Sequence, residues 1–277
     1  MTDPSEADCI RVVFQPSGMG DRSYNDQIYQ GLRQVYEQSG YFSLEVCNPE
    51  SEDTAKAAVQ DWFTPEDAAR HRRRLLILAA SNLAPYLPEN LDGDVLVLDH
   101  KEPIDGAYTR YVSAREVSKK AGEAVWDAGI RKVEVVLANP QLKVLEDFSE
   151  GFVEGFTGKG GAFNQETDLR YLGAGAYEGF DCGEALYRMC KDFPNGSFVL
   201  PACGGSIEGV LRYTREKPGV LKTCGVDSSM GLYSSDVMFS IVKRMDLLVG
   251  EFAEAWLDGE TLARHESYED GYIYLEK

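Results

Sequence analysis

The chain has 277 residues, 43% of them hydrophobic, and carries a formal net charge of −18 at pH 7. This length allows one large domain or two smaller ones, each with enough apolar residues for a core. The negative charge disfavours a polyanionic partner, so we expect neither nucleic acid nor an anionic membrane surface as a partner. The basic run Arg70–Arg74 is short, and we interpret it as a solvated helix end. No apolar run approaches the roughly 18 residues that a membrane-spanning helix needs.

Cysteine and histidine residues are few and scattered along the chain. The six cysteines include no CxxC pair, and the three histidines are His71, His100 and His265. Together with incomplete glycine motifs, this pattern predicts no metal site, no cofactor and no Cys/His nucleophile. We interpret most of the cysteines as buried thiols, and a disulfide between Cys203 and Cys224 stays open.

Short β-rich runs alternate with helical stretches along the whole chain. Several of the helical stretches end in glycine, which commonly stops a helix. The alternation predicts βαβ units and parallel sheets that helices cover on both faces. The expected strands are residues 9–14, 43–47, 74–80, 94–99, 108–113, 133–138, 168–173, 197–202 and 221–226.

So many strands favour two sheets, and therefore two lobes. We place the break between the sheets at Lys101–Tyr108, where proline and glycine separate two strands. The segment 234–260 adds one further strand and a long amphipathic helix, which we expect to pack back on the first sheet. The apolar face of this helix carries Leu247, Leu248, Phe252 and Trp256.

Polar residues gather after the expected strands rather than before them. In open parallel sheets, ligands bind beyond the carboxyl ends of the strands. The asymmetry therefore indicates one functional edge in each lobe, and we expect a ligand cleft between these edges. The five polar segments are QPSGMGDRSYND, SNLAPY, AGAYEGFD, CGGSIEG and DSSMG.

The side chains in these segments suit recognition rather than reaction. Carboxylates accept hydrogen bonds from hydroxyl groups, aromatic rings stack on a flat ligand, and glycines let backbone N–H groups approach closely. None of the histidines lies there, so we expect no Ser/His/Asp triad and no enzyme. The candidate ligand-binding residues are Asp21, Tyr24, Asn25, Ser81, Tyr177, Phe180, Gly204, Gly205, Asp227 and Lys243.

Six short motifs occur in a fixed order along the chain. The first, GDRSYNDQIYQGL, is similar to D-x-S-F-N-x-x-x-W-x-G, with Tyr24, Asn25 and Tyr29 at the Phe, Asn and Trp positions. EVSKKAGEAV, FSEGFVEGF, SFVLPACGGSIEGV, CGVDSSM and FSIVKRMD follow in register. Together they resemble the basic membrane protein family, the substrate-binding lipoproteins of purine-nucleoside ABC importers.

The resemblance implies a fold and a division of the chain. The fold is the α/β type I periplasmic-binding-protein fold, with two doubly wound parallel-sheet lobes and a ligand cleft between them. Lobe I would comprise residues 8–108 and 233–259, and lobe II would comprise residues 109–232 and 260–277.

The resemblance also implies a purine nucleoside as the ligand and gives the candidate residues their roles. Asp227 and Lys243 would hold the ribose hydroxyls, and Gly204 would give a backbone contact. Asp21 and Asn25 would meet the base or the ribose. The base would stack between Tyr24 and one further ring, that of Tyr177 or Phe180.

By the same resemblance, the protein is an extracytoplasmic solute-binding lipoprotein that passes its ligand to an ABC permease. Membrane attachment would then be only through a lipid anchor, and both the anchor and the signal segment are absent from this chain. The chain departs from the family pattern at Ala114, Lys119 and Ser229. Two alternatives therefore stay open: the same fold with a sugar ligand, or a ligand sensor or receptor domain that serves no transporter.

Overall fold

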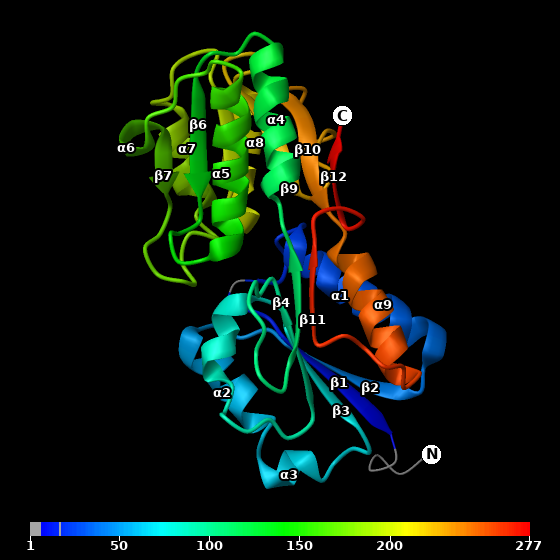
Figure 1. The fold of residues 1–277 in the computed structure, drawn as a ribbon. Helices are drawn as coiled ribbons and strands as arrows, with labels where there is room; N and C mark the ends of the chain where they lie inside the picture. The colour runs from blue at the N-terminus through cyan, green and yellow to red at the C-terminus, as the bar shows by residue number, and fades with distance from the viewer. Residues whose placement is uncertain (1–6, 17) are drawn as a thin grey trace. The chain divides into compact units, whose positions relative to one another are not determined.

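The computed structural model describes residues 7–16 and 18–277, which form two compact units (Figure 1). Residues 1–6 and residue 17 lie outside the described residues. Unit 1 comprises Met1–Gly20, Asn25–Tyr111 and Arg244–Tyr268. Unit 2 comprises Asp21–Tyr24, Val112–Lys243 and Glu269–Lys277.

Unit 1 is built on a six-stranded sheet with the strand order β11-β5-β4-β3-β1-β2. The strands from β1 to β5 pair in parallel with their neighbours. Every residue of β1 and β3 is buried, which explains why both strands are apolar apart from Asp8, Arg11 and Arg74. The strands are β1 (Asp8–Val13), β2 (Phe42–Cys47), β3 (Arg74–Leu78), β4 (Asp94–Leu98), β5 (Tyr108–Val112) and β11 (His265–Tyr268).

Helix α9 (Met245–Leu257) packs on unit 1, as the sequence predicts. Its Phe252 ring meets Tyr108 edge-on at 5.3 Å, and the indole nitrogen of Trp256 donates a hydrogen bond of 2.9 Å to Asp94. Of the four predicted apolar contacts, only Leu247 is largely exposed, at 38%. The other helices of this unit are α1 (Tyr24–Ser39), α2 (Glu52–Asp61), α3 (Pro65–Ala68) and the 3₁₀ helix η2 (Ser81–Tyr86).

Unit 2 contains the second six-stranded sheet, with the order β12-β10-β9-β8-β6-β7. All neighbours pair in parallel except β12, which runs antiparallel to β10. Its strands are β6 (Val133–Leu137), β7 (Leu169–Tyr171), β8 (Phe198–Ala202), β9 (Lys222–Asp227), β10 (Val237–Lys243) and β12 (Ile273–Glu276). Its helices are α4 (Arg115–Asp127), α5 (Lys143–Gly158), α6 (Gln165–Asp168), α7 (Gly183–Cys190), α8 (Glu208–Glu216) and the 3₁₀ helix η3 (Gly204–Ile207).

All of the expected strands are present, but the chain changes sheets at other positions. Strand β5 pairs with β4, so the chain leaves the first sheet after β5 and not at Lys101–Tyr108. Strand β10 pairs with β9 in the second sheet, whereas the sequence places it in the segment 233–259 of lobe I. A connection with proline and glycine can lead back to the same sheet or away from it, and strand pairing decides which.

The basic run before β3 is more ordered than a solvated helix end. Arg74 is the first residue of β3, and only 5% of its side chain is exposed. Arg72 and Arg73 both donate hydrogen bonds to the carboxylate of Asp8. These hydrogen bonds therefore join the start of β1 to the start of β3.

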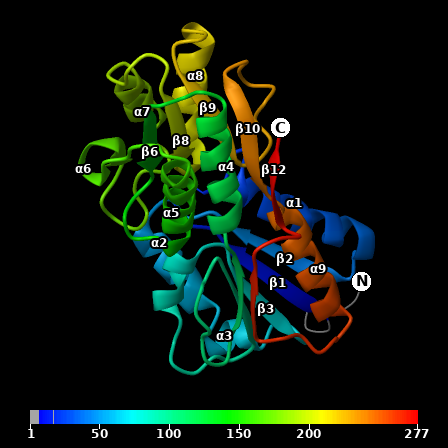
Figure 2. The same ribbon diagram turned by 45° about the horizontal axis from the view of Figure 1, so that its top comes forward.

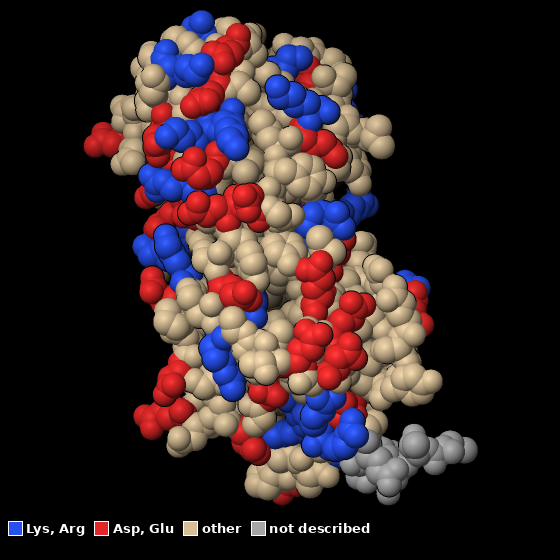
Figure 3. Space-filling model, turned by 45° about the vertical axis from the view of Figure 1, so that its right-hand side comes forward, with Lys and Arg blue, Asp and Glu red and all other residues tan. Residues whose placement is uncertain are grey.

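On the face shown in Figure 3, acidic and basic side chains are interspersed.

The six cysteines are all free, so Cys203 and Cys224 form no disulfide. Burial raises the pKa of the Cys190 thiol to about 12, as expected for an inert buried thiol. Among the described residues, no helix combines the length and the hydrophobicity that a bilayer crossing requires.

Helices α4 and α5 lie side by side on one face of the second sheet, in direct backbone contact (Figures 1 and 2). A Cβ atom added at Gly151 would lie 2.1 Å from the carbonyl oxygen of Arg115, and one at Gly155 would lie 2.0 Å from that of Lys119. A Cβ atom added at Gly122, on α4, would lie 2.1 Å from the carbonyl oxygen of Phe152, on α5. Glycine is therefore the only residue that permits this helix spacing.

We expect Gly155→Ala to lower the free energy of unfolding by about 1–3 kcal/mol, because the added methyl group forces the helices apart. Urea denaturation followed by circular dichroism measures this loss. The matched control is Gly158→Ala, three residues further along α5, where an added Cβ has no neighbour within 4 Å. Equal stability of the two variants would contradict the packing explanation.

Candidate functional site

Eight of the ten predicted ligand-binding residues belong to unit 2, and Asn25 and Ser81 belong to unit 1. Within unit 2, the polar segments follow β7, β8 and β9, and β10 ends at Lys243; the parallel pairing of these strands brings their carboxyl ends to one edge of the sheet. We call this the carboxyl edge of unit 2. It is the position at which open parallel sheets bind ligands.

Strands β9 and β10 end in two charged side chains at this edge. Strand β9 ends at Asp227 and β10 ends at Lys243, and the register pairs Asp227 with Val242, the residue before Lys243. The φ angle of Asp227 is 62°, in the left-handed region that residues other than glycine seldom adopt. Such backbone strain is common at ligand sites, where the surrounding structure holds it in place.

Lys243 is buried, with 1% of its surface exposed. Its Nζ atom lies 5.8 Å from the ring centroid of Tyr24 and 5.5 Å from that of Phe148. Both distances allow attraction between the ammonium and the face of the ring. The edge thus presents a carboxylate and an ammonium group on adjacent strands, with aromatic rings beside the ammonium.

The segment Asp21–Tyr24 belongs to unit 2, although the residues on both sides of it belong to unit 1. Ser23 is 2% exposed, and its hydroxyl donates a hydrogen bond of 3.0 Å to the carbonyl of Val226, the residue before Asp227. The backbone N–H of Ser23 donates to the Asp21 carboxylate at 2.9 Å. These bonds hold Tyr24 beside the ends of β9 and β10.

The glycine pair after β8 makes room for Phe180. Gly204 has a φ of 54°, and a Cβ added there would lie 2.9 Å from the Phe180 ring. A Cβ added at Gly205 would lie 3.1 Å from the Phe180 carbonyl oxygen and 3.8 Å from Asp21. Phe180, the glycine pair and Asp21 are therefore close neighbours at this edge.

The loop that carries Tyr177 and Phe180 is fixed at two points. The Ser206 hydroxyl donates to the carbonyl of Gly179 at 2.7 Å and accepts from the N–H of Cys182 at 2.6 Å. Burial raises the pKa of the Cys182 thiol, so this thiol stays protonated at neutral pH. Tyr177 lies in the same loop, half-buried.

Sequence reasoning missed two buried polar side chains of unit 2. Asn139, the second residue after β6, is fully buried, and its amide donates to the carbonyl of Glu178 at 3.0 Å, which holds the Tyr177 loop. It follows an expected strand, so the strand-end rule could have found it. Asp147, which accepts a 2.6 Å hydrogen bond from Ser113, lies on α5, where no local pattern marks it.

In unit 1, the two candidates follow different strands of the first sheet. Asn25 is 5% exposed near the start of α1, where a Cβ added at Gly18 would lie 3.2 Å from its side-chain oxygen. Ser81 begins η2, after β3. The neighbouring Asn82 donates a hydrogen bond of 3.0 Å to Gln15, which joins the two segments.

No protein-family model matches the chain, and no curated protein matches it in sequence. Solved structures, in contrast, match it over almost its whole length. An ABC transporter solute-binding protein from Aeropyrum pernix K1 has a TM-score of 0.72 at 18% identity, covering 98% of this chain and 76% of that one. The glucose-galactose binding protein GanP from Geobacillus stearothermophilus has a TM-score of 0.70 at 14% identity, covering 99% and 98%. The Escherichia coli transcriptional repressor ascG has a TM-score of 0.67 at 12% identity, covering 98% of each chain.

The chain has the type I periplasmic-binding-protein fold. The predicted fold class, α/β with two doubly wound, mainly parallel sheets, is thereby confirmed. Solute-binding proteins and transcriptional regulators share this fold, and none of the three proteins named above is an enzyme. Identities of 12–18% show the fold alone and not the basic membrane protein family.

We expect Gly179→Ala to disturb the Phe180 loop, because an added Cβ would lie 2.0 Å from the carbonyl oxygen of Ala138. The matched control is Gly196→Ala, which has nearly the same φ, 83° against 85°, but no neighbour within 4 Å. Thermal unfolding should give a lower melting temperature for Gly179→Ala than for the control. If the two melting temperatures agree, the positive φ alone explains why position 179 needs glycine. The close approach to Ala138 would then not hold the loop as tightly as we conclude.

Proposed function

We propose that the protein is a solute-binding protein for a purine nucleoside. The observation that carries this proposal is the pair formed by Asp227 and Lys243 at the ends of adjacent strands, with the Tyr24 ring beside the ammonium. A carboxylate accepts and an ammonium donates, so together they satisfy two neighbouring hydroxyl groups of a ribose. An aromatic ring at the same edge offers a face to a flat base.

The other candidates complete this assignment. Phe180 or Tyr177 supplies the second ring for the base, and Gly204 supplies a backbone contact. The resemblance of the first motif to the basic membrane protein family supports the same roles for Tyr24 and Asp21. The predicted ligand contacts of Asn25 and Ser81, which lie in unit 1, stay predictions.

The proposed partner is an ABC importer, and the proposed location is outside the cytoplasm, on a lipid anchor. The fold shared with an ABC transporter solute-binding protein supports this role. The fold shared with the repressor ascG supports the alternative, a sensor domain. Fractionation of the native cells distinguishes these two roles. We expect an importer component in the periplasmic or membrane fraction, and a regulator in the cytosolic fraction.

We expect Asp227→Ala to weaken nucleoside binding at least tenfold, about 1.4 kcal/mol, because the ribose hydroxyls lose their acceptor. Isothermal titration with inosine, adenosine and guanosine measures the dissociation constant. The control is Asp192→Ala, which removes the same charge from an exposed position of unit 2. Unchanged affinity in Asp227→Ala would refute the ribose assignment.

A thermal-shift screen of nucleosides, free bases and sugars tests the ligand class itself. A ligand that binds only the folded state adds about 2.7 kcal/mol of stability at a hundredfold excess over its dissociation constant. A rise in melting temperature with nucleosides supports the proposal. A rise in melting temperature with sugars alone would refute the nucleoside assignment and favour a sugar ligand for the same fold.

A further inference from the structure

A second group of functional side chains lies in unit 1, near the amino end of β1, and it also includes residues of the edge strand β2 and of the loop before β3. The Sγ atom of Cys9, one imidazole nitrogen of His71 and a carboxylate oxygen of Glu45 all lie within 4.8 Å of one another. Among the described residues, this is the one group of three Cys, His or acidic side chains with such spacing. The function proposed above uses none of them.

The fold brings these residues together from three separate segments. The register pairs Arg11 with Glu45, so Cys9 and Glu45 lie two residues apart on one face of neighbouring strands. His71 lies in the loop before β3, which the backbone ties to β1. The backbone N–H of Cys9 donates to the carbonyl oxygen of Arg73 at 2.9 Å, and the backbone N–H of Arg72 donates to the carbonyl oxygen of Ala7 at 3.1 Å.

His71 is buried without the hydrogen bonds that an imidazole normally makes. Only 8% of its side chain is exposed, and its Nδ1 atom has no hydrogen-bond partner. Its Nε2 atom lies 3.9 Å from Oε1 of Glu45, which is too far for a hydrogen bond. Nε2 is the ring nitrogen that faces Glu45, so it is the candidate ligand atom, and Nδ1 would carry the proton of the neutral imidazole.

The spacing suits a shared metal ion better than direct contact. Ligand atoms at about 2.0–2.3 Å from a tetrahedral zinc ion lie about 3.3–3.8 Å from one another. The separation between His71 and Glu45 is close to that range, and the remaining separations need side-chain shifts of at most about 1 Å to reach it. The mixture of thiolate, imidazole and carboxylate favours zinc over magnesium or calcium, which prefer oxygen ligands alone.

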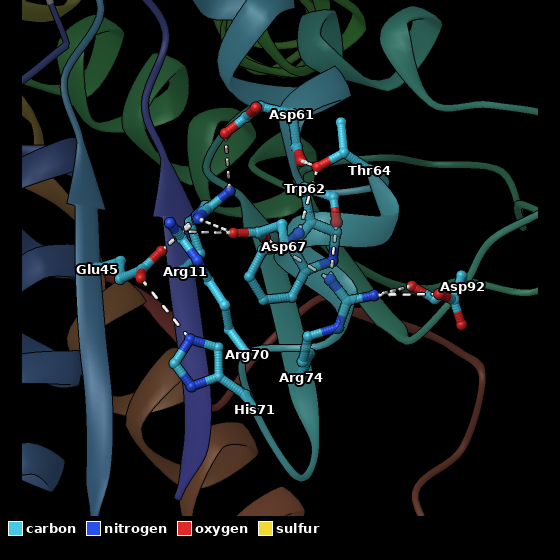
Figure 4. A network of polar contacts seen from close by, with 10 residues as sticks. All are labelled: Arg11, Glu45, Asp61, Trp62, Thr64, Asp67, Arg70, His71, Arg74 and Asp92. Atoms are coloured by element: carbon cyan, nitrogen blue, oxygen red, sulfur yellow. Dashed lines mark hydrogen bonds and ion pairs between the residues drawn. The ribbon is translucent and has the colours of Figure 1, made fainter. Parts of the chain in front are cut away.

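The surrounding charges orient Glu45 and balance the site (Figure 4). Arg11 donates to Oε2 of Glu45 at 2.6 Å, which leaves Oε1 facing His71. The charge of Arg11 is in turn shared with the buried Asp67, at 3.0 Å. Metal-binding carboxylates commonly have an outer partner of this kind, which fixes their orientation. A thiolate and a carboxylate together neutralise a divalent ion.

We propose that Cys9, Glu45 and His71 bind a zinc ion, with water as the fourth ligand. Glu45 is 33% exposed on the edge strand, which gives the ion access from solvent. Cys9 is near the amino end of β1, whereas the ligand-binding segments follow the carboxyl ends of the strands. The ion therefore fastens β1, β2 and the loop before β3 to one another, and takes no part in nucleoside binding.

The test is a titration of the chelator-treated full-length protein with Zn²⁺, followed by calorimetry. We expect one ion per chain and a higher melting temperature with zinc. Substitution by Co²⁺ should give a thiolate-to-cobalt charge-transfer band, which reports a cysteine ligand directly. Cys9→Ser, His71→Gln and Glu45→Gln should each weaken zinc binding at least tenfold. Cys190→Ser, a control at an equally buried thiol in unit 2, should bind as the unaltered protein does.

Several results would overturn the proposal. One is a dissociation constant for Zn²⁺ above about 10 μM in the unaltered protein, and another is a cobalt form that lacks the thiolate band. Undiminished zinc binding in Glu45→Gln would place the ion elsewhere. Because Glu45 is 33% exposed on the edge strand, this variant keeps the test valid if Cys9→Ser fails to fold. Circular dichroism of each metal-free variant verifies folding. Nucleoside affinity measured with and without zinc separates this proposal from the previous one, because we expect no difference.

Discussion

The parallel pairing of the strands in unit 2 is the constraint on which the candidate site depends. Parallel strands bring all their carboxyl ends to one edge, so the residues after β8, β9 and β10 meet there although they are far apart in sequence. Asp227 and Lys243 become neighbours for this reason alone. The hydrogen bond from Ser23 to Val226 then adds a segment from near the start of the chain.

Glycine serves a second purpose beyond the turns at this edge. At Gly151 and Gly155 it permits backbone contact between α4 and α5, and at Gly204 it leaves room for an aromatic ring. Several motifs that resemble the basic membrane protein family contain these glycines. Part of the resemblance therefore reflects helix and loop packing, which many ligands can share. The charged and aromatic residues are the part that bears on the ligand.

The two ends of the first sheet differ in chemistry. At the amino end, Arg11 and Arg74 lie on the Trp62 ring at 4.8 Å each, and the buried Asp67 forms ion pairs with both of them. Buried charges need such partners, because an unpaired charge away from water is costly. This network gives the amino end a fixed geometry, on which the proposed zinc site depends. The carboxyl end carries the short polar segments that include Asn25 and Ser81.

The sequence by itself determined the strands, the parallel α/β class and the strand ends at which polar residues gather. These features follow from hydrophobic periodicity and local turn residues, which neighbouring positions encode. Only the tertiary structure decided that β5 stays in the first sheet, that β10 joins the second, and that Leu247 is exposed. It alone brought Cys9, Glu45 and His71 together, although the sequence predicts no metal site. The physical reason is that strand order and register depend on backbone pairing between distant segments, and no local pattern records which edges will meet.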